Sequence, residues 1–284
     1  MNPNDYLYEV AEAYWPGLPR DEFEEYVALG VDAAVLLELE WQDVVLQGGP
    51  ELDWQDMGAA AILDRERIGQ FYDHAFGLIF ELMRGIGPPD EMSAADHRGN
   101  IVHNGMVSRA GHGPILDYGG GIGQQSLFLA RKEWKVGYTD LGETAAFARW
   151  RFEQEDLLAG PKLRMWTANS VHVLRSPDFA LRPLHEEGSI PWGALIALDV
   201  VEHIPDPVDL LRRFDAALAP DGLLFLTRHS FRPYPTHLPE TGFLMEKLDD
   251  VLAGMGYRPV IPPDGHFGIG AWQKTGPAVD ASPP

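Results

Sequence analysis

The chain has 284 residues, a formal net charge of −21 at pH 7 and no cysteine. This length favours one large α/β domain with a smaller addition, and the lack of cysteine excludes disulfides, thiolate metal sites and a cysteine nucleophile. The negative charge argues against a protein that binds nucleic acid or anionic membranes, because phosphate surfaces repel it.

The first hundred residues are predicted to be helical. In residues 20–46 apolar side chains recur every three or four positions, and Asp21 is placed to cap that helix. A second helical stretch, residues 59–87, ends at glycines before a Pro-Pro turn. Residues 90–113 favour one more short helix.

The amino terminus carries acidic residues and lacks a basic flank followed by an apolar run, so it does not resemble a signal peptide. No apolar run approaches the length of a membrane span. We therefore expect a soluble, cytoplasmic protein.

From residue 114 short apolar strands alternate with amphipathic helices, which predicts a parallel sheet with right-handed crossovers. Asp206 is a plausible N-cap, followed by Pro207 at the first helical position. The last two strands are separated by too few residues for a crossover and should pair antiparallel. The expected strands are residues 114–119, 135–140, 162–169, 193–200, 220–227, 257–262 and 266–274, and the expected helices 124–134, 144–158, 207–218 and 243–256.

A glycine-rich turn, ILDYGGGIGQ (115–124), joins the first of these strands to its helix. Such a turn lets the backbone and the helix N-terminus approach a ligand closely. The dinucleotide pattern G-x-G-x-x-G is missed, because Gln124 occupies its last position. The glycines at 119, 121 and 123 after Asp117 instead form D-x-G-x-G-x-G, which resembles the first motif of class I S-adenosylmethionine-dependent methyltransferases. On its own the pattern also fits a tight strand-to-helix turn of another α/β protein.

Three further segments strengthen this resemblance. Asp140 ends the second strand, where the family places a carboxylate that accepts both ribose hydroxyls. Asn169-Ser170 follows the expected third strand, where the family places a polar residue against adenine, although aspartate is commoner than Asn169. The segment LDVVEHIPDP (198–207) is very similar to the family's post-strand segment in small-molecule enzymes. The resemblance assigns the following residues to cofactor binding: Asp117, Gly119, Gly121, Gly123, Gln124, Asp140, Leu141, Asn169, Ser170, Asp199 and Val200.

The resemblance covers residues 114 to about 230 closely and extends to 274 by architecture. It implies a Rossmann-like fold with a seven-stranded, mostly parallel sheet, an antiparallel last strand and helices on both faces. We expect residues 1–111 to form a helical lid that recognises the substrate, residues 112–275 to bind S-adenosylmethionine, and residues 276–284 to form a flexible tail. The expected activity is methylation of a small organic molecule at oxygen, nitrogen or carbon, with no nucleic-acid or membrane partner.

The sulfonium already carries a good leaving group, so the protein's main task is alignment. A base would help if the acceptor must lose a proton, and His203 is the leading candidate, with a structural role as its alternative. Tyr72 is a second catalytic candidate. The alternative is that it only packs in the core as part of an aromatic helix face. No metal site is expected, because the spacing of His229, His237 and His266 matches no standard motif.

Two other functions remain open at this stage. One is a cyclase or lyase that uses S-adenosylmethionine without transferring methyl. The other is a binding protein that keeps the cofactor fold without turnover, which the intact motif residues make less favourable.

Overall fold

The computed structural model describes nine segments of the chain, and every structural statement below concerns them: residues 3–28, 76–83, 86, 93–109, 113–159, 168–186, 188–228, 237–262 and 268–276. Tyr72, His229 and His266 lie outside these segments, as does all but one residue of the expected tail. No helix in the described segments is long and apolar enough to cross a membrane.

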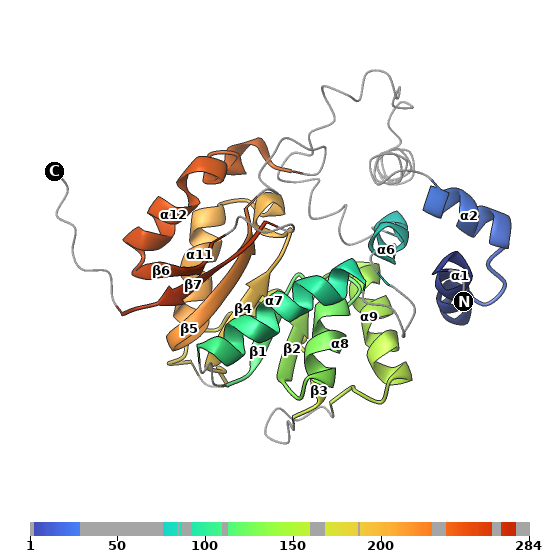
Figure 1. Ribbon diagram of the computed structural model, residues 1–284, viewed down its shortest axis with the longest axis horizontal. Helices are drawn as coiled ribbons and strands as arrows, with labels where there is room; N and C mark the ends of the chain where they lie inside the picture. Colours follow the sequence, from blue (N-terminus) through green and yellow to red (C-terminus); the bar gives the residue numbers. More distant parts are fainter. Residues whose placement is uncertain are drawn as a thin grey trace.

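Seven strands of the described chain form one twisted sheet, in the order β3-β2-β1-β4-β5-β7-β6 (Figure 1). Strands β1 to β5 pair in parallel, whereas β7 lies antiparallel between β5 and β6. This confirms the predicted Rossmann-like sheet with its antiparallel last strand. The strands are β1 (Ile115–Tyr118), β2 (Lys135–Thr139), β3 (Ser170–Val173), β4 (Trp192–Ala197), β5 (Leu218–Thr227), β6 (Tyr257–Ile261) and β7 (Ile269–Lys274).

Helices cover both faces of the sheet because the inner strands are apolar on both sides. One apolar core joins α7, α8 and α9 to the sheet, and a second joins α10, α11 and α12 to the opposite face. These helices are α7 (Ala94–Ser108), α8 (Gln124–Arg131), α9 (Gly142–Gln154), α10 (Pro177–Ala180), α11 (Pro207–Ala217) and α12 (Leu244–Gly254).

The amino-terminal helices α1 (Pro3–Tyr14), α2 (Arg20–Ala28) and α6 (Phe76–Met83) lie beside α9 and outside the two sheet cores (Figure 1). They share an apolar cluster with two residues of the sheet domain, and we call it the amino-terminal cluster. Trp15 stacks on Phe80 and on Phe147 of α9, with ring centroids 5.1 and 5.6 Å apart. The buried members are Leu7, Ala11, Phe23, Ile79, Phe80, Met83, Ile86, Ile122 and Phe147.

Two features differ from the expected organisation. Helix α7 falls within residues 1–111, yet its Val102 and Met106 are fully buried in the sheet core, so it covers the sheet. A capping box between Ser93 and Asp96 starts this helix. The third strand begins at Ser170, after the 162–169 span predicted from sequence.

Candidate functional site

The glycine-rich turn after β1 has the backbone that its sequence predicts. Gly119, Gly121 and Gly123 have φ values of 65°, 53° and 75°, in the left-handed region that favours glycine. A Cβ at Gly119 would lie 2.6 Å from Val200, and one at Gly123 would lie 2.4 Å from the Phe152 ring. The turn therefore packs tightly on its protein side and leaves backbone N–H groups at the start of α8.

The buried side chain of Asp117 stabilises this turn from the protein interior. Its side chain is buried and accepts a hydrogen bond from the Ser126 hydroxyl at 2.6 Å. Its carboxylate also fills the space beside Gly120, where a Cβ would lie 2.7 Å from Oδ2. Burial raises the pKa of Asp117 to about 6. The carboxylate thus shapes the turn through protein contacts.

Asp140, directly after β2, is joined to the turn by a hydrogen bond. Its Oδ2 accepts from the Gly121 N–H at 2.5 Å, and its Oδ1 accepts from the Leu141 N–H at 2.6 Å and the Thr144 hydroxyl at 3.2 Å. Burial raises the pKa of Asp140 to about 6, against the opposing effect of these donors. Because a carboxylate can accept about four hydrogen bonds, these three leave room for a ligand hydroxyl.

Gln124 is held by a residue that the sequence did not single out. Its Oε1 accepts from Arg151 Nη2 at 2.7 Å, and Arg151 Nη1 donates to the Ile122 carbonyl at 2.8 Å. Burial lowers the pKa of Arg151 to about 10. A single arginine of α9 therefore fixes both Ile122 of the turn and Gln124, the first residue of α8.

The segment after β4 carries Asp199 and Val200, at the same carboxyl edge of the sheet as the turn and Asp140. Asp199 has a φ of 55°, its N–H donates to the Thr227 hydroxyl at 2.8 Å, and its carboxylate pairs with Arg98 of α7 at 2.7 Å. Val200 packs against Gly119, as described above. No motif drew attention to Arg98, because only the fold brings α7 to this edge.

Asn169 and Ser170 do not follow the third strand, contrary to the prediction from sequence. Ser170 is the first residue of β3 and pairs with Lys135 at the beginning of β2, and Asn169 precedes it, so the two residues lie at the start of the third strand and not after its end. They lie at the opposite edge from Asp140, and this position argues against an adenine contact. The residues that do follow β3 begin at Leu174, whose N–H donates to the Tyr138 carbonyl.

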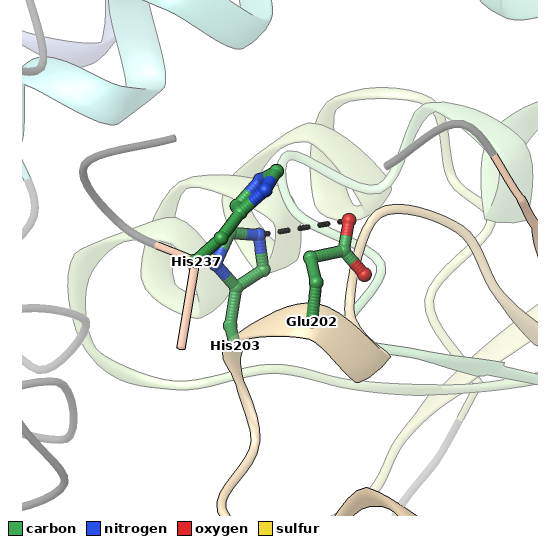
Figure 2. Close-up of side chains that lie close together, drawn as sticks. All are labelled: Glu202, His203 and His237. Carbon is green, nitrogen blue, oxygen red and sulfur yellow. Dashed lines mark ion pairs between the residues drawn. The ribbon is translucent and has the colours of Figure 1, made fainter. Parts of the chain in front are cut away.

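His203 lies just beyond Val200, in the 3₁₀ helix η2 (Val201–His203). Its N–H donates to the Val200 carbonyl at 3.0 Å, and its side chain is 13% exposed. Glu202 and His237 lie beside it, and one ligand atom from each of the three residues falls within 4.8 Å of the others (Figure 2). His203 and His237 are 34 positions apart in the sequence, so only the fold brings them together.

A sequence profile of the family described as "Methyltransferase domain" matches residues 95–247, more than half of the chain. The chain belongs to this family. The match confirms the resemblance drawn from the motifs: the protein is a class I methyltransferase that uses S-adenosylmethionine. No curated protein sequence matches it significantly.

Several solved structures are similar to this methyltransferase. Magnesium protoporphyrin IX methyltransferase from Synechocystis PCC 6803 with bound S-adenosylmethionine is 16% identical, with a TM-score of 0.48 over 76% of this chain and 100% of that one. The 1,6-didemethyltoxoflavin-N1-methyltransferase of Burkholderia thailandensis is 17% identical, with a TM-score of 0.42 over 80% and 93% of the two chains. The [4+2]-cyclase SpnF is 18% identical, with a TM-score of 0.46 over 70% and 75%.

The site fits its cofactor on structural grounds. The turn is free of side chains at its three left-handed positions, and the Asp140 carboxylate beside it has room for a further hydroxyl donor. The structure brings together the turn, Asp140, Leu141, Asp199 and Val200 at one edge of the sheet. It sets Asn169 and Ser170 apart.

Proposed function

We propose that this methyltransferase transfers the methyl group of S-adenosylmethionine to a small organic acceptor and that His203 takes the acceptor's proton. The observation that carries the proposal is the hydrogen bond between Gly121 and Asp140. It joins two motifs of the sequence at the carboxyl edge of the sheet, where ligands of open α/β folds bind. The net charge of −21 favours a small acceptor over nucleic acid.

The residues of the edge divide the task of holding the cofactor. The N–H groups of the turn and the start of α8 suit polar groups, and the free acceptor site on Asp140 suits a ribose hydroxyl. Leu141 and Val200 add apolar side chains at this edge. S-adenosylmethionine supplies an electrophilic methyl group, so the protein needs no covalent intermediate, only alignment of acceptor, methyl and sulfur.

His203 is the best-placed group to accept a proton. It lies three residues after Val200, which contacts Gly119 of the turn, and 13% of its side chain is exposed at the carboxyl edge of the sheet. An imidazole within hydrogen-bond reach of an acceptor O–H or N–H increases the rate by taking that proton. The structure does not describe Tyr72, which stays a second candidate from the sequence alone.

We assign the helices α1, α2 and α6 to a lid over the cofactor side of the edge. Leu82 of α6 lies against the turn, because a Cβ at Gly121 would be 2.9 Å from its Cδ1. Ile122 of the turn is itself part of the amino-terminal cluster. Packing of these helices is thus coupled to the conformation of the turn that holds the cofactor.

Product analysis tests this function. The protein is incubated with S-adenosylmethionine bearing a CD3 group and a panel of small phenols, carboxylic acids and amines, and both cofactor and acceptor products are identified by mass spectrometry. We expect S-adenosylhomocysteine together with a CD3-labelled acceptor. Methylthioadenosine as the cofactor product would instead indicate a cyclase or lyase acting on the aminobutyrate chain.

The role of His203 is tested on the acceptor so found. His203→Ala should lower single-turnover methylation by about 10²–10⁴-fold with almost unchanged affinity for S-adenosylhomocysteine, because a base acts on the acceptor and not on the sulfonium. His185→Ala, at an exposed histidine, is the matched control. Normal turnover in His203→Ala excludes it as the base, and a joint loss of binding and turnover indicates a structural role.

A further inference from the structure

The side chains of His203, His237 and the buried Glu202 lie close together after the carboxyl end of β4. The imidazole rings of His203 and His237 have centroids 4.8 Å apart with an angle of 73° between their planes. The Glu202 carboxylate lies 3.9 Å from His203 Nε2, along the dashed line in Figure 2. The three side chains come from two segments that are more than thirty residues apart in sequence but side by side in space.

Backbone hydrogen bonds hold the two segments in register. The Glu202 carbonyl accepts from the Leu238 N–H at 2.9 Å and from the Thr241 hydroxyl at 3.3 Å. Thr241 also donates to the Leu238 carbonyl at 2.7 Å, and both residues are 1% exposed. His237 directly precedes this buried anchor, so its place over His203 is fixed by the fold.

The spacing of the donor atoms suits one metal ion. Donors about 2.0–2.2 Å from the same ion lie about 3.3–3.6 Å apart in a tetrahedral site and about 4.0–4.4 Å apart only when they stand on opposite sides of the ion. The 3.9 Å between Glu202 and His203 is about 0.3–0.6 Å longer than the tetrahedral spacing, and the outer bound of 4.8 Å for the group is about 1.2–1.5 Å longer, so binding requires the side chains to move toward one another.

The ring geometry agrees with this interpretation. Two imidazoles bound to one ion through nitrogen place their centroids about 4.5 Å apart at a right angle and about 5.2 Å apart at the tetrahedral angle. The observed 4.8 Å falls between these values. Two imidazole nitrogens and a carboxylate oxygen are the donor set that zinc, cobalt and nickel accept readily.

Burial adds an electrostatic argument. The Glu202 side chain is 1% exposed, and a carboxylate so removed from water is favoured by a nearby positive charge. A divalent ion between the three side chains would supply that charge at bonding distance. We propose that Glu202, His203 and His237 bind one divalent transition-metal ion of the zinc class.

The proposed ion site goes beyond the proposed function and also constrains it. A nitrogen that coordinates an ion has no lone pair for a proton, so an occupied site prevents His203 from acting as a base through that nitrogen. Zinc is therefore expected to inhibit methyl transfer. The binding site itself stands on the geometry of three side chains and does not require His203 to be the base.

Isothermal titration of the full chain with ZnCl₂ tests the proposal without any acceptor. The wild type is treated with a chelator, which is then removed, and should bind one Zn²⁺ per chain. His237→Ala should weaken this affinity by at least about 100-fold, because losing even an outer-shell partner of a metal ligand costs 10–100-fold. His185→Ala, which removes an exposed histidine outside the group, should bind as the wild type does. Titration with Co²⁺ should give the intense visible absorption of a low-symmetry site in the wild type and not in His237→Ala.

Two results would overturn the site: no stoichiometric Zn²⁺ binding by the wild type, or equal binding by wild type and His237→Ala. Glu202→Gln gives a second check in which the buried side chain keeps its size, and unchanged Zn²⁺ affinity in this variant would also contradict the assignment. Failure of the ion site is distinguishable from failure of the proposed function, because methyl transfer by the chelator-treated wild type is measured in the same preparation.

Discussion

Replacement of Asp140 by asparagine perturbs the carboxylate that we propose binds the ribose of the cofactor. In the structure this carboxylate accepts hydrogen bonds from the Gly121 and Leu141 N–H groups and from Thr144. An asparagine offers only one acceptor oxygen, so its amide group must face one of the two backbone donors. Asp140→Asn therefore loses an acceptor for ribose and also part of the bond that holds the turn.

The size of the effect follows from the charge of the acceptor. A hydrogen bond to a charged group contributes about 1.5–3 kcal/mol, which corresponds to about 10- to 150-fold in affinity. The raised pKa of about 6 gives the contact a pH dependence. Because protonation removes the charge, wild-type affinity should be constant above about pH 7 and fall about tenfold by about pH 5, whereas the asparagine variant should not show this fall.

Titration calorimetry with S-adenosylhomocysteine between about pH 5 and pH 8 measures both quantities. Thr144→Val is the matched control, because it removes the 3.2 Å hydrogen bond to Asp140 and the 2.8 Å bond to the Leu141 carbonyl but leaves the carboxylate in place. An unchanged dissociation constant in Asp140→Asn would refute the assignment. An identical pH dependence in variant and wild type would show that another group is responsible for it.

Three further predictions concern the turn, the lid and the buried acid. Gly123 has a φ of 75°, and a Cβ there would lie 2.4 Å from a Phe152 atom, so Gly123→Ala should lower both Tm and cofactor affinity. Gly254→Ala is the control, because its Cβ would meet no atom within 4 Å; it should leave both quantities unchanged or raise Tm slightly. A chain that begins at residue 93 lacks α1, α2 and α6 and exposes Ile122 and Phe147, so it should aggregate or bind cofactor weakly. Size-exclusion chromatography and an activity assay check this; a soluble, fully active truncation would contradict the lid. The folded-state pKa of Asp117, raised by burial to about 6, lies above the usual value of 3.8, so the folded state binds more protons and this group's contribution to stability falls as pH rises from about 4 to about 6. Asp117→Asn removes that fall, and urea unfolding of both proteins should show a stability difference that shifts in favour of the variant over this range; a constant difference would argue against the raised pKa.

Local sequence signals predicted most of the fold. Alternating apolar strands and amphipathic helices fixed six of the seven strands to within a few residues, and the short link between the last two strands gave their antiparallel pairing. The third strand was expected at residues 162–169 because that span has apolar residues; only its last two residues are described, and the strand that pairs with β2 is Ser170–Val173.

The cofactor edge was predictable where it depends on glycine and on residues next to strand ends, as at Gly121 and Asp140. It was not predictable where partners come from distant elements. Arg98 reaches Asp199 across 101 positions, and Arg151 reaches Gln124 across 27. His237 meets His203 only because a buried turn anchors it to the Glu202 carbonyl. Neither arginine belongs to a motif, so the sequence alone gave no reason to single out either one.

A crystal structure of the protein with S-adenosylhomocysteine tests the central claim most directly. We expect a ribose hydroxyl at the Asp140 carboxylate, the remainder of the ligand along the turn at Gly119–Gly123, and the sulfur directed toward His203. Ligand density at another edge of the sheet, or a ribose without contact to Asp140, would contradict the account.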